Sequence, residues 1–135
     1  MIHTNIQIDG VDKTGKDLIL KYVVMLSNHK YVIQSRGLLS QMAYSKIYDR
    51  PYSYSFEDYP NTLFIYLTGE LEDLTIRHKL TDEPKINIEK DMQAFEEIVS
   101  TNKNLVHTFN TSKETPYNIA KQIIALAEEK EKHYV

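Results

Sequence analysis

The segment IQIDGVDKTGKDLILKYVV (residues 6–24) constrains the fold of this chain more than any other stretch. Polar and apolar residues alternate over residues 2–9, which predicts a strand, and apolar residues recur at helical spacing over residues 15–27, which predicts a helix. Between them, Gly10 to Lys16 fit the pattern G-x-x-x-x-G-K. Its glycines let backbone N–H groups surround phosphate oxygens, and the lysine adds positive charge. The segment predicts a phosphate-binding loop; the alternative is a strand, turn and helix that contain two glycines and a lysine by coincidence.

The residue after Lys16 departs from the usual phosphate loop. Such loops carry Ser or Thr there, and the hydroxyl binds the Mg²⁺ ion that bridges the terminal phosphates. Here the residue is Asp17. A carboxylate is also a magnesium ligand, but it repels phosphate when the metal is absent. The sequence therefore leaves open whether the loop is intact, rewired or no longer catalytic.

Composition narrows the class of protein. The chain of 135 residues predicts one domain spanning 1–135. A net charge of −3 argues against a general affinity for nucleic acid. Cysteine is absent, which excludes disulfides and thiolate metal sites. The start MIHTNIQIDG does not resemble a signal peptide, and no apolar run is long enough to span a bilayer, so we expect a cytoplasmic protein without membrane contact.

Strand and helix patterns alternate along the whole chain. Strands are predicted at residues 2–9, 31–34, 62–67 and 104–109, and helices at residues 15–27, 37–48, 70–79, 88–100 and 115–132. The composition of the second strand, YVIQ, predicts that it is buried. This alternation predicts a three-layer α/β domain with about four parallel strands, and ligands beyond the carboxyl ends of the strands.

Three motifs resemble the thymidylate kinase family of P-loop nucleoside monophosphate kinases. IDGVDKTGK (residues 8–16) is similar to that family's FEGxDxxGK[ST], and VIQSRGLLSQMAY (residues 32–44) is similar to VIxDRYxxSxxAYQ. YPNTLFIYLTGELEDLTIRH (residues 59–78) is similar to xPDLTIYLDVxPExALxR. The matches cover nearly the whole chain in the family's order, so the resemblance implies a P-loop kinase-like fold that uses ATP and Mg²⁺.

The resemblance also implies roles for individual residues. The nucleotide would lie against Gly10, Asp12, Lys13, Thr14, Gly15, Lys16 and Asp17. Lys16, Lys13 and Arg36 would be catalytic, where Lys13 stands at the loop position that holds an arginine in one type of relative. Arg36 would bind the acceptor phosphate, while Ser40 and Tyr44 would line the acceptor site. From the residues alone, the alternatives are that Arg36 is a structural ion-pair partner near a strand end and that Tyr44 is a packing residue. Arg77 falls where the family's helix ends in arginine, and is either a helix-terminal charge or a catalytic group.

A paired exchange marks the expected metal site. Where the family has an acidic residue just before its arginine, this chain has Ser35. Where the family has a Ser or Thr just after the loop lysine, this chain has Asp17. One hypothesis is that this carboxylate and this hydroxyl still surround Mg²⁺ with their positions exchanged. The other is that both positions drifted after metal-dependent catalysis was lost.

The chain also departs from the family by deletion. Relatives carry a second strand and several helices, with an R-E-P element and another arginine that grip the acceptor, where this chain has only NHK (residues 28–30). The lid at residues 78–87 has lysines in place of arginines. The acceptor-binding insertion is therefore missing from the expected fold.

Three functions remain at this point. The first is ATP-dependent phosphorylation of a (deoxy)nucleoside monophosphate. The second is a catalytically inactive relative that binds a nucleotide or phosphate as a regulatory module. The third is a protein-interaction module, for which the tyrosine-rich residues 44–60 offer a surface, although tyrosines also stack on bases. Relatives form a dimer contact through the helices after their first and third strands, so we also expect a possible homodimer.

Overall fold

The computed structural model describes residues 4–53, 55–81 and 87–133. Its strands are β1 (Asn5–Gly10), β2 (Val32–Ser35), β3 (Thr62–Thr68) and β4 (Val106–Asn110). Its helices are α1 (Lys16–Leu26), α2 (Leu38–Ile47), α3 (Leu71–Lys79), α4 (Ile88–Thr101), α5 (Pro116–Glu131) and the 3₁₀ helix η1 (Phe56–Asp58). The predicted elements are therefore confirmed to within a few residues where described. Parts of the expected first strand (residues 2–3) and lid (residues 82–86), and Tyr54, lie outside the described residues.

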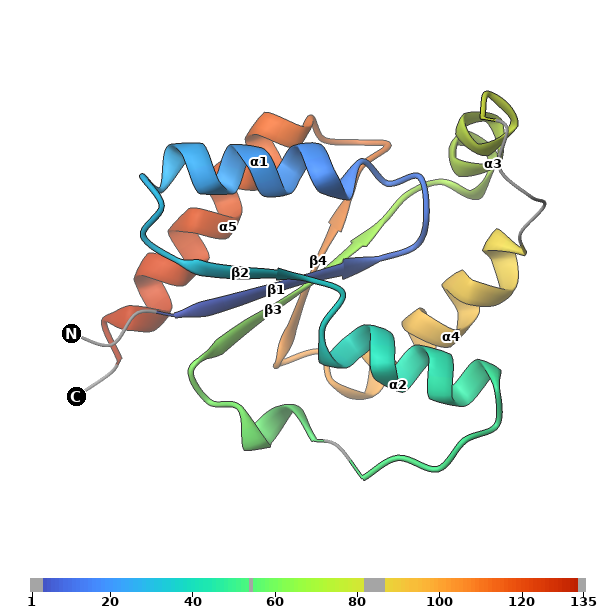
Figure 1. The fold of residues 1–135 in the computed structure, drawn as a ribbon, viewed down its shortest axis with the longest axis horizontal. Coiled ribbons are helices and arrows are strands. Elements are labelled where there is room, and N and C mark those ends of the chain that lie inside the picture. Colours follow the sequence, from blue (N-terminus) through green and yellow to red (C-terminus); the bar gives the residue numbers. More distant parts are fainter. Residues whose placement is uncertain (1–3, 54, 82–86, 134–135) are drawn as a thin grey trace.

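The four strands form one parallel sheet in the order β2-β1-β3-β4. Helices α1 and α5 cover one face and helices α2 and α4 cover the other, as Figure 1 shows. This arrangement confirms the predicted three-layer α/β domain. Within the part of the chain described, no helix is long and apolar enough to cross a membrane.

Each face of the sheet carries its own apolar core. The cluster under α1 and α5 includes Ile8, Ile65 and Ile123, all fully buried. The cluster under α2 and α4 is built around Tyr66 and Phe95, whose rings stack with centroids 5.4 Å apart. The alternation of side chains along β3 supplies both clusters, which is why all its residues but the last are buried.

The expected burial of the second strand is wrong. β2 is an edge strand that pairs with β1 alone, and it is mostly exposed, with Val32 64% accessible. Its composition is that of a covered strand, but α1 leads into it after a tight turn through residues 27–31. The described chain has no further strand to pair with its open edge.

Strand order fixes where a ligand can lie. The chain leaves β1 toward β2 on one side and later adds β3 on the other side. A crevice forms beyond the carboxyl end of a strand at which the direction reverses, because the flanking helices then lie on opposite faces. The loop after β1 and the residues after β2 therefore face the same space.

Candidate functional site

The loop between β1 and α1 has the conformation of an anion-binding nest. Lys13 and Gly15 adopt left-handed backbone angles, with φ of 72° and 77°. When left-handed residues alternate with right-handed ones, successive N–H groups turn toward one point. The N–H groups of Thr14, Gly15 and Lys16 have no acceptor among the described residues. The loop thus presents free donors at the start of α1, where the helix dipole also favours an anion.

The two glycines of the motif serve different needs. A Cβ on Gly10 would lie 2.5 Å from the carbonyl oxygen of Leu67, so the close approach of β1 to β3 demands glycine there. A Cβ on Gly15 would meet nothing within 4 Å, and its requirement is the left-handed backbone. The Thr14 hydroxyl donates to the Val11 carbonyl at 2.9 Å and is buried. Thr14 can therefore offer a ligand its backbone N–H, while its hydroxyl closes the loop.

Arg77 fixes the loop from outside. Its Nη1 donates to the Lys13 carbonyl at 2.9 Å and to Thr111 Oγ1 at 3.3 Å, and its Nη2 donates to the Thr111 carbonyl at 3.5 Å. The Thr111 hydroxyl in turn donates to the carbonyl of Thr68 at the end of β3. The last turn of α3 therefore ties the left-handed residue of the loop to the segment after β4. Arg77 is thus a helix-terminal charge, one of the two roles that the sequence suggested, and its contacts add a support for the loop that the sequence did not suggest.

Lys16 lies in a strongly charged environment. Burial lowers the pKa of its ammonium group, and the nearby Arg36 guanidinium lowers it further. Asp9, Asp17 and Asp12 act in the opposite direction. Two neighbouring cations that repel each other stabilise any anion that enters between them.

A cavity of about 630 Å³ opens over the loop. It is lined by Val11, Asp12, Lys13, Thr14, Gly15, Lys16, Asp17, Leu18, Ser35 and Arg36. The structure thus brings together the predicted phosphate-binding residues except Gly10, which lies beneath them in β1. Asp17 and Ser35, the two predicted metal ligands, line the same cavity. Among the residues that the structure describes, no group of three or more His, Asp or Glu side chains forms a metal site of its own.

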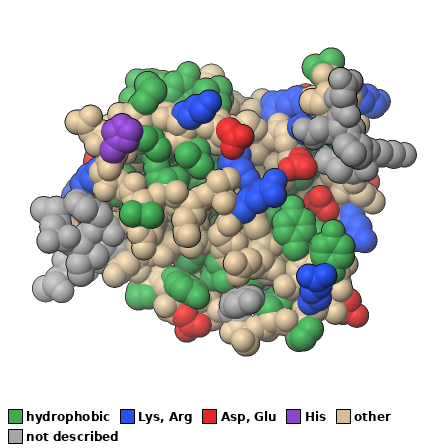
Figure 2. Space-filling model, in the orientation of Figure 1, with side chains coloured by type: hydrophobic (Ala, Val, Ile, Leu, Met, Phe, Trp, Pro, Cys, Tyr) green, Lys and Arg blue, Asp and Glu red, His purple; other side chains and the backbone are tan. Residues whose placement is uncertain are grey.

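A second cavity of about 390 Å³ runs along α2. Its lining includes the three predicted acceptor-site residues, Arg36, Ser40 and Tyr44. Arg36 lines both cavities. It forms no ion pair with any other described residue, so within the described part of the chain the interpretation of Arg36 as a structural ion-pair partner is wrong. Figure 2 shows Lys and Arg side chains gathered near the middle of this face, where Figure 1 places the start of α2, with Asp and Glu side chains beside them.

The Tyr44 side chain both packs against the core and lines the cavity along α2. Its ring meets Phe95 edge-on with centroids 6.3 Å apart, while the side chain is only partly buried. Burial raises the pKa of the Tyr44 hydroxyl, and Asp91 and Asp12 raise it further. Both interpretations of this residue are therefore compatible with its position.

Two side chains of β1 cap α2. Asp9 Oδ1 accepts hydrogen bonds from the Gly37 N–H at 2.7 Å and from the Ser40 hydroxyl. Gln7 Oε1 accepts from the Leu38 N–H at 2.8 Å. Gly37 has no side chain with which to cap the helix, so β1 supplies acceptors for its free N–H groups. A buried carboxylate thus connects the strand that leads into the phosphate loop with the helix that lines the second cavity.

Sequence reasoning missed the roles of Gln7 and Asp9. The signal was present, because IQID places two polar side chains on one face of a strand that is otherwise buried. Burial raises the pKa of Asp9, although Ser40, Gly37 and Lys16 all favour its ionised form. Its Oδ2 atom is buried and has no hydrogen-bond partner in the described structure.

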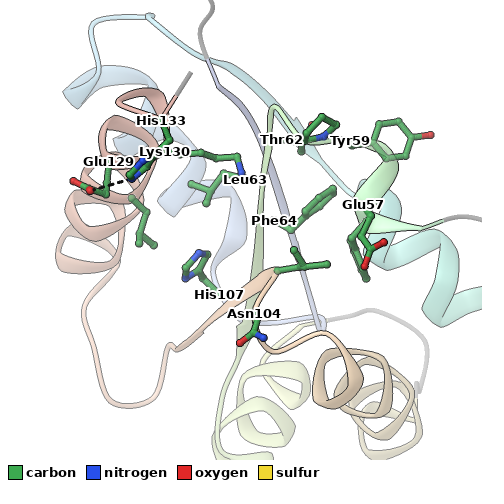
Figure 3. Close-up of a pocket in the computed structure, with 14 residues that line it drawn as sticks. Glu57, Tyr59, Thr62, Leu63, Phe64, Asn104, His107, Glu129, Lys130 and His133 are labelled. Atoms are coloured by element: carbon green, nitrogen blue, oxygen red, sulfur yellow. Dashed lines mark ion pairs between the residues drawn. The ribbon is translucent and has the colours of Figure 1, made fainter. Parts of the chain in front are cut away.

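A third cavity, of about 480 Å³, lies at the opposite end of the sheet (Figure 3). Figure 3 shows His107 and Asn104 on one side, Tyr59 and Glu57 on another, and the end of α5 above. Two of the polar groups that line this cavity contact each other, since His133 Nε2 lies 3.5 Å from Glu129 Oε1. Burial and the nearby Lys130 lower the pKa of His107. None of the predicted site residues lies there.

Comparisons with known proteins bear on the fold. A scan against models of known protein families finds no match, and a search of curated proteins finds none either. Among solved structures, the chain is similar to the YorR protein from Bacillus subtilis, crystallised in complex with phosphorylated GDP. The TM-score is 0.67 at 17% sequence identity, and the match covers 98% of this chain and 100% of that chain. At this identity the likeness confirms the three-layer α/β fold.

Proposed function

We propose that this protein binds ATP at the phosphate loop and transfers its γ-phosphoryl group to a (deoxy)nucleoside monophosphate bound along α2, as thymidylate kinases do. The observation that carries the proposal is the position of Arg36, which lines the phosphate-loop cavity and the α2 cavity together. A donor phosphate in the first and an acceptor phosphate in the second would meet at this guanidinium. The fold that the chain shares with YorR, a protein crystallised with a phosphorylated nucleotide, supports nucleotide as the ligand class.

Catalysis in this proposal consists of positioning and charge neutralisation. The bond from the γ-phosphorus to its bridging oxygen breaks, and a bond to an acceptor phosphate oxygen forms. Lys16, Lys13 and the loop N–H groups hold the donor phosphates, and Arg36 neutralises the acceptor phosphate. Burial and, after it, repulsion by Arg36 lower the pKa of Lys16, and phosphate oxygens between the two cations would relieve that repulsion.

The residues present fit a magnesium ion. Mg²⁺ is usually held by one or two carboxylates together with substrate phosphates and water. Asp17 and Ser35, in the lining of the loop cavity, supply one carboxylate and one hydroxyl. When bound, the ion would neutralise charge on the donor phosphates, and Asp17 would no longer repel them.

A second candidate is a nucleotide-binding module without catalysis. The observation in its favour is Asp17 itself, a carboxylate where phosphate loops carry a hydroxyl. The described chain also offers only two arginines, Arg36 and Arg50, along the acceptor cavity, because the segment that grips the acceptor in relatives is missing.

Transfer of radiolabel from γ-labelled ATP to a panel of nucleoside monophosphates separates the two candidates. We expect labelled diphosphate from the wild-type protein, and a kcat lower by about 100-fold in Arg36→Met, since removing one charge-stabilising donor typically costs about that much or more. Transfer that is absent in the wild type, with ATP still bound, would favour the inactive module.

A further inference from the structure

The α2 cavity has a second arginine at its far end. Arg50 lines it together with Arg36, Ser40, Gln41, Tyr44 and Ser45. Arg36 precedes α2 and Arg50 follows it, and a helix of that length extends about 15 Å. The two arginines therefore stand at opposite ends of one elongated pocket.

The local backbone directs Arg50 to this pocket. Asp49 adopts a left-handed conformation with φ of 53°, which reverses the chain after α2. The Arg50 N–H then donates to the Ser45 carbonyl at 2.7 Å, so the residue folds back on the last turn of the helix. Its guanidinium lies over the Tyr48 ring, 5.3 Å from the centroid, which restricts the side chain.

The charge of the pocket is unbalanced. Its lining contains two arginines and no carboxylate among the described residues. Neither Arg36 nor Arg50 has an ion pair in the described part of the chain. A pocket of about 390 Å³ is at the small end of the range for small-molecule sites, and suits one mononucleotide rather than a larger ligand.

The two ends of the pocket differ in what they adjoin. Arg36 also lines the phosphate-loop cavity, so in the proposed reaction the acceptor phosphate must lie at that end. The base then extends along α2, past the partly exposed Tyr44 ring, toward Arg50. Arg50 is thus placed at the edge of the base.

We infer that Arg50 is a specificity-determining residue that selects nucleoside monophosphates whose base presents acceptors at this edge. A guanidinium only donates, and it pairs well with O6 and N7 of guanine or O4 of thymine. Adenine and cytosine carry an amino group at the corresponding positions, which would face another donor. The inference rests on the proposed function and assigns the acceptor's chemical class.

The test is calorimetric titration of dGMP, dTMP, dAMP and dCMP into the whole chain. We expect the wild-type protein to bind dGMP and dTMP more tightly than dAMP and dCMP by about tenfold. Arg50→Met should remove this difference. Arg50→Lys should bind dGMP and dTMP more weakly than wild type but keep part of the preference, because an ammonium group also only donates but lacks the planar fork. Lys46→Met is the matched control, since Lys46 lies on α2, outside the pocket, in an ion pair with Glu97.

Three results would overturn the inference. They are an equal loss for all four nucleotides in Arg50→Met, an Arg50→Met variant that discriminates like the wild type, and a wild type that binds none of them. ATP is titrated into the same samples. If ATP binds and is used but the base preference does not depend on Arg50, only this inference fails; if ATP does not bind, the proposed function fails as well.

Discussion

Asp9 shows how one residue connects the two cavities. Asp9 is near the end of β1, and its side chain is 1% exposed and close to Lys16. Its Oδ1 accepts hydrogen bonds from residues at the start of α2. In the sequence, Asp9 stands where the similar motif FEGxDxxGK[ST] has a glutamate. The pattern IQID marks Asp9 as a polar residue within an apolar strand, but its contacts with α2 depend on how β1 and α2 approach each other in three dimensions.

The first prediction concerns Asp9→Asn. The pKa of Asp9 is raised above its ordinary value near 4, so the folded state holds this proton more tightly than the unfolded state. Its contribution to stability is therefore greatest below about pH 4 and is lost as pH rises through the raised pKa. The amide oxygen of the variant can still accept both hydrogen bonds without a charge. We expect the variant to gain free energy of unfolding relative to wild type as pH rises from about 4 to about 7.

Urea unfolding at several pH values checks this difference. Asp58→Asn is a suitable control, because Asp58 lies exposed in η1. Parallel stability profiles of wild type and Asp9→Asn would show that the buried carboxylate does not titrate differently on folding.

At the scale of elements, the site depends on contacts between segments far apart in the sequence. The phosphate loop is tied to α3 and to the β4–α5 segment through Arg77, and α2 is capped by β1. Sequence patterns predicted the loop and the helix over residues 37–48 separately. They did not predict the side chains that hold the two in place.

The second prediction concerns this support of the loop. Arg77→Met removes three hydrogen bonds from a partly buried guanidinium while keeping a long side chain. We expect ATP affinity to fall roughly five- to tenfold and the free energy of unfolding to fall by about 1–3 kcal/mol. Lys79→Met, on the same helix but exposed, should change neither quantity.

Calorimetry and urea unfolding of both variants distinguish positioning from bulk stability. A loss of stability in Arg77→Met with unchanged ATP affinity would mean that Arg77 supports the fold and not the loop conformation.

At the scale of the whole molecule, the sequence predicted the architecture well. The alternation of strand and helix patterns implied a parallel sheet with two helical layers, and the structure has both. The exception is β2, whose apolar composition suggested burial although it forms an open edge. Periodicity records which side chains are apolar, and it does not record whether another segment is present to cover them.

The pocket along α2 has few charged groups. Among the described residues, Arg36 and Arg50 are its only charged lining residues. Arg50 was not a candidate from sequence, because its position depends on the left-handed turn at Asp49. Such a turn at a residue other than glycine is uncommon and is hard to foresee from one sequence.

Calorimetric titration of ATP with and without Mg²⁺ tests the central claim, that the loop after β1 binds a nucleotide. Wild-type protein is compared with Lys16→Met, and Lys21→Met serves as the control because Lys21 is exposed on the same helix. We predict saturable binding that Mg²⁺ strengthens, that Lys16→Met weakens by roughly 10- to 100-fold, and that Lys21→Met leaves unchanged. Absence of binding, or equal affinity in Lys16→Met, would contradict the account.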